Sequence, residues 1–327
     1  MARAAGVSTA TVSLVLNGRG AIGKATRDRV KRVAAELAYR PSIRAQRLRT
    51  GRSGSIAVIT TIPDTVVGGS SRLGYLLDIA IAVAGSALKR GYSMVLTPPM
   101  ADVSELDALD IDGAILLDPV ENDPFAARLA GRGVRIVTIG DVEGVQSVGT
   151  VDRGVAGADV LIEHLIAQGC IHLLLISSIE RTAVATSVRA YAAAREARGD
   201  MRLTTLELPL RDAEQEAYRV VSGMLARGTD VDAVYAPIDL FAVGAGRALC
   251  EAGRRIPEDV RLVTHYNGLR AQTFEPPITA LDLHLDRMAE LAVMLLLDSL
   301  EGRADRTVLP APRPDVIVRG STRTVVG

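Results

Sequence analysis

The sequence predicts an α/β protein with a small, all-α, basic head and a larger body of two lobes built around parallel sheets. One observation behind this is a segregation of charge: residues 1–53 hold 12 Lys and Arg against two acidic residues, whereas the rest holds 26 against 36. The other is the alternation of apolar strands with amphipathic helices from residue 55 onwards, which is typical of parallel sheets flanked by helices. The net charge of zero therefore conceals a head of +10, suited to a polyanion, on a body of −10.

Three short helices are expected in the head, residues 1–41. A first helix over 2–5 ends at Gly6. Ser8 can cap a second helix over 9–16, because its hydroxyl can accept an N–H of the first turn. Val12, Val15 and Leu16 share one face of that helix and should pack inward. A third helix is expected from about 25 to 38, and a basic hinge and linker with helical potential follows over 42–53.

Two successive series of strands and helices are expected in the body, residues 54–327. The first series has strands over 56–62, 93–97, 113–117 and 135–139, with helices over 72–90 and 124–131. The second has helices over 154–168, 185–198, 213–227 and 239–252, with strands over 172–177, 204–208, 233–236 and 262–264, and a last strand over 316–319. Two series indicate two lobes. Because ligands of open parallel sheets bind at the carboxyl ends of strands, the cleft between the lobes is the expected small-molecule site.

Several protein classes are disfavoured. No apolar run approaches the roughly 18 residues that a membrane span needs, and no apolar export signal opens the chain, so a cytoplasmic, nucleoid-associated protein is expected. Cys170 and Cys250 have no metal-ligand spacing. The chain has no P-loop and no HExxH, and Gly244 and Gly246 lie inside an expected helix, not at a strand-to-helix turn. We therefore expect no enzyme, no metal, no cofactor and no membrane contact.

A set of motifs resembles the lac repressor family of transcription regulators, in the same order along essentially the whole chain. These motifs are ARAAGVSTATVSLVLNG (residues 2–18), TRDRV (26–30), ELAYRP (36–41), AQRLRTG (45–51), VDR (151–153), APID (236–239), EAGRRIPEDV (251–260) and PPITA (276–280). The resemblance implies a helix-turn-helix headpiece that binds a palindromic, double-stranded DNA operator as a homodimer and probes it in the major groove. It also places Met1 inside the first helix of the motif, where the family usually carries Val, so we expect a misassigned start in which a GTG valine codon was read as the initiator.

The resemblance also implies a body like that of periplasmic sugar-binding proteins, with a small-molecule effector between the lobes. The N-terminal lobe is expected over about 54–151 and 281–307, and the C-terminal lobe over about 152–280 and 308–327. A small-molecule binding protein without DNA function is the alternative, and the charge of the head argues against it. A nucleotide-dependent enzyme is a more distant one.

The residues expected at DNA follow from the same motifs: Ser8, Thr9, Ala10, Thr11, Ser13, Leu14, Asn17 and Thr26 in the headpiece, with Arg44, Ala45 and Leu48 in the hinge. The resemblance implies that Thr9, Ala10 and Leu14 face base edges. Leu14 stands where many members carry Arg, so contact with a thymine methyl is expected in place of a guanine contact. Leu48 matches a wedge that kinks the minor groove; taken alone, it is also compatible with ordinary helix packing.

The residues expected at the effector, again implied by the resemblance, are Arg189, Tyr266, Ile238, Asp239, Gly140 and Leu283. Arg189 matches an Arg that grips ligand oxygens, and a surface or interlobe salt bridge is an equally weighted interpretation. Gly140, Ile238, Tyr266 and Leu283 replace polar residues of the family, and a sugar loses affinity when its hydroxyls lose buried partners. We therefore expect an effector with an anionic group for Arg189 and an apolar body, or no effector at all.

Overall fold

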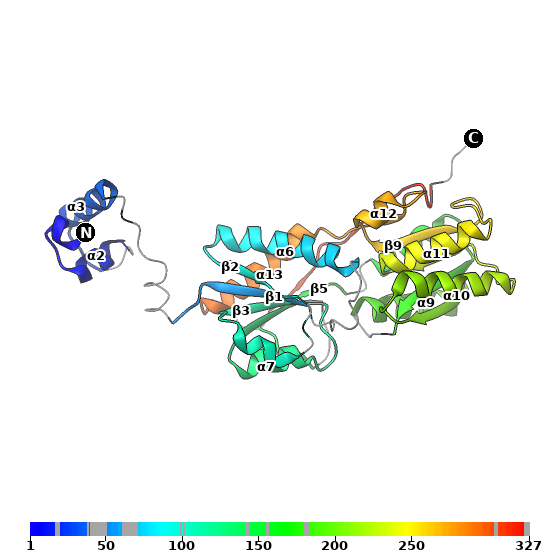
Figure 1. Cartoon of the computed structure of the whole chain (residues 1–327), viewed down its shortest axis with the longest axis horizontal. Coiled ribbons are helices and arrows are strands. Elements are labelled where there is room, and N and C mark those ends of the chain that lie inside the picture. Colours follow the sequence, from blue (N-terminus) through cyan, green and yellow to red (C-terminus); the bar gives the residue numbers. More distant parts are fainter. Residues whose placement is uncertain are drawn as a thin grey trace. The chain divides into compact units, whose positions relative to one another are not determined.

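The computed structural model describes residues 1–16, 20–37, 39, 51–60, 71–98, 100, 102–140, 144–154, 157–179, 183–303 and 307–323. They form two compact units, Met1–Ser53 and Gly54–Gly327 (Figure 1). Each unit is treated by itself below as the head and the body.

The head consists of the helices α1 (Ala2–Ala5), α2 (Thr9–Leu16) and α3 (Lys24–Glu36). Gly6 ends α1 in the left-handed conformation with φ 60°, which costs a glycine little. Ser8 caps α2, since its Oγ accepts the backbone N–H of Thr11 at 3.1 Å. The core of the head is a small apolar cluster around the buried residues Ala5, Val12, Val15, Val30 and Val33. The three-helix expectation and the Ser8 cap are thus confirmed.

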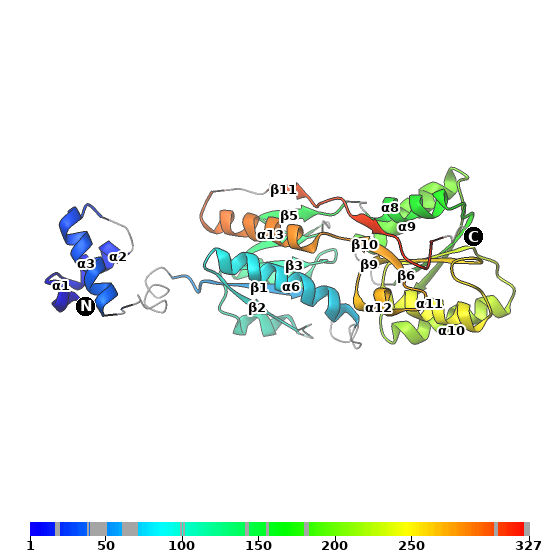
Figure 2. The same ribbon diagram turned by 90° about the horizontal axis from the view of Figure 1, so that it is seen from above.

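The first lobe contains a parallel, six-stranded sheet in the order β11-β5-β4-β3-β1-β2. Its strands are β1 (Ser55–Thr60), β2 (Ser93–Leu96), β3 (Gly113–Leu117), β4 (Arg135–Ile139), β5 (Gly149–Asp152) and β11 (Thr307–Pro310). Its helices are α6 (Ser71–Lys89), η1 (Val103–Ala108), α7 (Pro124–Gly131) and α13 (Leu285–Leu300). Helices α6 and α13 pack side by side on one face of the sheet, and α7 lies on the other (Figures 1 and 2).

The second lobe contains a six-stranded sheet in the order β12-β10-β9-β8-β6-β7, parallel except for β12. Its strands are β6 (His172–Ser178), β7 (Arg202–Leu208), β8 (Ala233–Ala236), β9 (Arg261–Tyr266), β10 (Thr279–Asp282) and β12 (Asp315–Ile317). Its helices are α8 (Ala158–Ala167), α9 (Ala183–Ala197), α10 (Ala213–Ala226), α11 (Asp239–Glu251) and α12 (Leu269–Thr273). Central strands such as β8 are buried along their whole length, which explains their continuous apolar runs.

The chain passes between the two lobes three times: after β5, after β10 and after β11. Strand β10 still pairs in the second lobe up to Asp282, and β11 pairs in the first lobe up to Pro310. The expected changes of lobe near 281 and 308 therefore fall a few residues too early. Strands β5, β10 and β11 were not expected, because each carries at most two apolar residues among four and no alternation that distinguishes it from a loop.

The glycines Gly244 and Gly246 serve packing. Helices α10 and α11 lie against each other, and a Cβ on Gly244 would lie 2.2 Å from the backbone oxygen of Glu214 on α10. A Cβ on Gly246 would lie 2.5 Å from the Phe274 ring. The close approach of the two helices thus requires glycine at position 244.

Gly244→Ala should therefore lower the free energy of unfolding by about 1–3 kcal/mol, because the added methyl forces α10 and α11 apart. Gly223→Ala is the matched control within α10, where the nearest atom to the added Cβ is the end of the Arg227 side chain at 3.5 Å. That change should be neutral or stabilise by about 0.5–1 kcal/mol, because alanine loses less backbone entropy than glycine. Urea unfolding followed by circular dichroism measures both; equal midpoints for the two variants would contradict the packing role.

Candidate functional site

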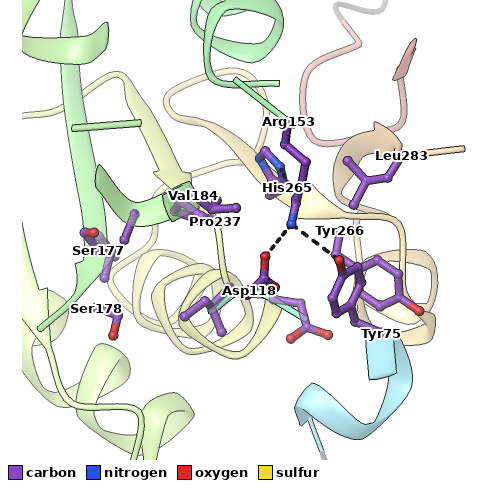
Figure 3. Close-up of a pocket in the computed structure, with 14 residues that line it drawn as sticks. Tyr75, Asp118, Arg153, Ser177, Ser178, Val184, Pro237, His265, Tyr266 and Leu283 are labelled. Carbon is purple, nitrogen blue, oxygen red and sulfur yellow. Dashed lines mark hydrogen bonds and ion pairs between the residues drawn. The ribbon is translucent and has the colours of Figure 1, made fainter. Parts of the chain in front are cut away.

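A cavity lies where the carboxyl ends of strands from both lobes meet (Figure 3). Its lining residues are Tyr75, Asp118, Arg153, Ile176, Ser177, Ser178, Val184, Ala185, Pro237, Ile238, Asp239, His265, Tyr266 and Leu283. Asp118 directly follows β3, Arg153 follows β5, and Tyr266 is the last residue of β9. Parallel strands bring their carboxyl ends to one edge of a sheet, so residues far apart in sequence converge there. The cavity therefore occupies the position expected for a ligand between the lobes.

Arg153 connects both lobes inside this cavity. Its Nη1 donates to Asp118 Oδ1 at 2.6 Å and lies 3.4 Å from the Tyr75 hydroxyl, both in the first lobe. Its Nη2 lies 3.4 Å from Nε2 of His265 in the second lobe. The side chains of Arg153 and Asp118 are only 10% and 17% exposed. Figure 3 shows the guanidinium between Asp118, His265 and the two tyrosines.

The protonation states of this network follow from its contacts. Burial lowers the pKa of the Arg153 guanidinium, but Tyr75 and Asp118 outweigh burial and the pKa is raised overall, so Arg153 stays charged. Burial, and then the charge of Arg153, lower the pKa of His265 to about 3. Since a guanidinium only donates, His265 Nε2 accepts from Arg153, which leaves the proton on Nδ1 facing the Tyr235 hydroxyl at 3.0 Å. His265 is therefore neutral at physiological pH.

A second contact between the lobes involves Tyr266. Its hydroxyl donates to the carboxylate of Asp78 on α6, and its ring meets that of Tyr75 edge to face, with the centroids 5.6 Å apart. Burial and the hydrogen bond to Asp78 both raise the pKa of Tyr266, so the phenol keeps its proton. Two tyrosine rings thus form one end of the cavity.

The expected effector residues divide into two groups. Tyr266, Ile238, Asp239 and Leu283 line the cavity. Arg189 and Gly140 are not among the lining residues.

Arg189 is engaged within the second lobe. Its Nη1 contacts Ser177 Oγ and the Ser178 carbonyl, each at 3.2 Å, and Glu207 Oε1 at 3.1 Å. It therefore holds the end of β6, where Ser177 and Ser178 line the cavity, and the expectation of an anionic effector rests on an arginine that already has a carboxylate partner. Gly140 ends β4 with φ 102°, and a Cβ there would lie 3.8 Å from Asp118 Oδ1.

Sequence reasoning missed Arg153, Asp118, Tyr75 and His265. Two of them carried a readable signal: Asp118 directly follows an apolar strand, and Arg153 belongs to the VDR motif, residues 151–153. A polar residue just beyond a buried parallel strand is placed at the ligand edge of the sheet. Tyr75 lies on a helix, and nothing in its local sequence distinguishes it from a core residue.

The expected DNA-binding residues of the head lie on or next to α2 and α3. Ser8, Thr9, Ala10 and Leu14 are exposed, and Thr11, Ser13 and Thr26 are partly exposed. They lie opposite the buried Val12 and Val15, so the N-terminal half of α2 presents short side chains to solvent. Asn17, Arg44, Ala45 and Leu48 lie outside the described residues, so their expected roles remain predictions.

Two further findings bear on the class of protein. No helix among the described residues is long and apolar enough to cross a membrane. Within the same part of the chain, no three His, Cys, Asp or Glu side chains come together in a way that could hold a metal ion.

Asp118→Asn should lower the free energy of unfolding by about 3–5 kcal/mol, because it leaves the Arg153 guanidinium buried without its countercharge. Asparagine tolerates the positive φ of 46° found at Asp118, so the backbone is kept. Adding Arg153→Met should recover most of the loss, because both charges are then gone.

Urea unfolding measures these differences. Asp107→Asn is the control in the same lobe, since it breaks the exposed ion pair between Asp107 and Arg128 and should cost no more than about 1 kcal/mol. A similarly small cost for Asp118→Asn would refute the structural role of the buried pair.

Two family models match the chain. A model of bacterial regulatory proteins of the lacI family matches residues 1–42. A model of the periplasmic binding protein-like domain matches residues 162–322. They match the head, and most of the second lobe together with α13 and β11 of the first, in the order that the motifs predicted.

Known relatives match over nearly the whole length. The HTH-type transcriptional regulator CelR of Thermobifida fusca is 29% identical over 332 residues, which cover 98% of this chain and 96% of CelR. The HTH-type transcriptional repressor PurR of Escherichia coli is 26% identical, and the match covers 98% of this chain and 95% of PurR.

Solved structures agree. A complex of the transcriptional regulator CelR with cellobiose has a TM-score of 0.69 at 27% identity, with 98% of each chain covered. A lac repressor dimer bound to operator and the anti-inducer ONPF has a TM-score of 0.76, with 99% of this chain and 98% of that chain covered; at 23% identity this likeness concerns the fold. Together with the family models, these matches confirm the resemblance, and the chain belongs to the lac repressor family of DNA-binding transcription regulators.

Proposed function

We propose that this regulator is a repressor that binds a twofold-symmetric operator as a homodimer and responds to a small molecule in the cavity between its lobes. The observation that carries the proposal is the exposed N-terminal half of α2 in a head of charge +10. A DNA-binding regulator acts at the chromosome, so the proposal places the protein in the cytoplasm. We propose no catalytic activity, since the named relatives are regulators.

The head has side chains suited to contact with bases in the major groove of DNA. A recognition helix must bring short side chains at its N-terminal end to base edges, and Thr9 and Ala10 meet this requirement. The positive end of the helix dipole at α2 favours nearby phosphates. Exposed cations on α3, such as Arg29, Lys31 and Arg32, add attraction for the DNA backbone. Base reading is thus assigned to α2 and general affinity to the cations around it.

Leu14 is the side chain on which sequence preference should depend most. It is 40% exposed, although Val12 and Val15 beside it are buried, so it faces outward from the head. An exposed leucine cannot donate to a base, and it suits contact with a thymine methyl. Leu37 offers a matched control, because it is an equally apolar side chain of the same head, 53% exposed at the end of α3.

Leu14→Ala should weaken binding to a duplex selected from a random library by about fivefold or more, which corresponds to roughly 1 kcal/mol. Binding to random duplex should stay the same, because non-specific affinity comes from phosphate contacts. Leu37→Ala should change neither affinity. Fluorescence anisotropy at several salt concentrations measures all of these.

The body alone, residues 54–327, is the second control in that experiment. It forms its own compact unit and carries a charge of about −10, so it should fold and should not bind duplex DNA. Retention of DNA binding by this fragment would refute the assignment of the head. Folding with no selected duplex for the full chain would favour the alternative, a binding protein without DNA function.

The proposed dimer face is a stripe on α6. It comprises Leu77, Ile81 and Leu88, which are 45%, 70% and 72% exposed, with Gly85 between the last two. Nothing lies within 4 Å of a Cβ at Gly85, so a second helix has room to approach. Leu96 on the edge strand β2 and Leu269 on α12 are further exposed leucines of the body, and α6 and α12 lie on the same face of it (Figures 1 and 2).

A second copy of the chain is the occupant we propose for this face. One head reads only half of a twofold operator, and two heads must be held together to read both halves. A contiguous apolar stripe of this kind marks an interaction site. In a twofold interface the same stripe serves both partners, which requires no further binding protein.

Ile81→Asp should convert the dimer into a monomer at micromolar concentration, because it places a charge at the centre of the stripe. Ile171→Asp is the matched control, since Ile171 is 66% exposed but lies at the start of β6 in the other lobe. It should leave the dimer intact. Light scattering decides; a wild-type monomer, or equal behaviour of both variants, would argue against this interface.

A further inference from the structure

We propose that the cavity between the lobes selects an uncharged molecule with an amide-like group and an apolar, aromatic body, and discriminates against ions of either sign. The proposal rests on the proposed function, because it names the class of effector for the same cavity. It replaces the expectation of an anionic effector, whose basis was Arg189.

The charged side chains that line the cavity already have partners. Arg153 is paired with Asp118 at 2.6 Å, and Asp239 lies 3.8 Å from Nη1 of Arg270. His265 contributes no charge at physiological pH. An anion entering the cavity would approach Asp118 and Asp239, and a cation would approach Arg153. Either ion would give up its water without gaining a counterion, which is costly in a buried site.

Arg153 and Asp118 differ in the hydrogen bonds that they can make with a ligand. A guanidinium carries five N–H donors, of which three in Arg153 face Asp118, Tyr75 and His265, and a carboxylate carries only acceptors. The Arg153–Asp118 pair therefore presents donors next to acceptors inside the cavity. An amide, lactam or urea group has the matching arrangement, a carbonyl beside an N–H, and carries no net charge. It binds such a pair without separating the two partners.

Much of the remaining lining of the cavity is apolar. The rings of Tyr75 and Tyr266 form one end of the cavity, and Val184 and Pro237 lie on the other side of Arg153 (Figure 3). Ile238 adds a further apolar side chain to the lining. Such surfaces favour a ring or other apolar body. Hydroxyl groups spread around a ligand would meet these surfaces without partners. The lining, which also holds the polar side chains of Ser177, Ser178 and Asp239, thus favours an apolar ring with its polar group at Arg153.

Benzamide, benzoate and benzamidine test this inference, because they share one ring and one size but carry charges of zero, −1 and +1. With the full chain, benzamide should bind at least about tenfold more tightly than either ion, measured by thermal shift and isothermal titration calorimetry at equal concentrations. Tighter binding of either ion, equal binding of the three, or binding of none would overturn the inference.

The variant Asp118→Asn provides a second test of the same inference. It removes the countercharge of Arg153, so benzoate should gain affinity relative to benzamide. The control Asp107→Asn neutralises a carboxylate that is also paired with an arginine, but on the surface of the same lobe, and it should leave the ranking unchanged. If Asp118→Asn does not fold, the double variant Arg153→Gln, Asp118→Asn keeps the site neutral and should keep the preference for benzamide.

Failure of this inference is distinguishable from failure of the proposed function. Selection of an operator and its loss in the 54–327 fragment depend on the head, and the probe series depends on the cavity alone. A regulator that binds its operator but prefers benzoate retains the proposed function and loses this effector class.

Discussion

The ion pair between Arg153 and Asp118 is the contact on which the arrangement of the body depends most. It joins the ends of β5 and β3 in the first lobe, and through His265 it reaches β9 in the second. Two buried charges are stable only while each satisfies the other, so neither residue is replaceable alone. The pair therefore holds three strand ends in place. Because its two charges cancel, it also suits the cavity to an uncharged ligand.

Much of the fold was predictable because it follows from local patterns. The Ser8 cap, the apolar face of α2 and the buried strands β3, β4 and β8 are each determined by residues a few positions apart. The short strands β5 and β10 were not predictable in this way. Each has at most two apolar residues among its four and is held by pairing with strands outside its own segment, β4 and β11 for one, β9 and β12 for the other.

The cavity shows the same limit at the level of single side chains. Arg189 lies on α9 and Arg153 directly follows β5, and only the fold decides which guanidinium lines the cavity. Arg189 pairs with Glu207 on the neighbouring strand β7, whereas Arg153 pairs with Asp118 in the lining of the cavity. Both partners are distant in sequence from the arginines that they hold, so no spacing rule reveals them. The motif match included Arg153 but did not show that its side chain lines the cavity.

The cavity and the proposed dimer face meet at one hydrogen bond. The Tyr266 ring lines the cavity, and its hydroxyl is held by Asp78, which lies between Leu77 and Ile81 on the exposed stripe of α6. A ligand that displaces this ring breaks the bond to Asp78, and one that packs against the ring strengthens it. Either event acts on the helix that we assign to the dimer contact. The cavity and the proposed dimer face on α6 are therefore connected through one direct contact, from Tyr266 to Asp78.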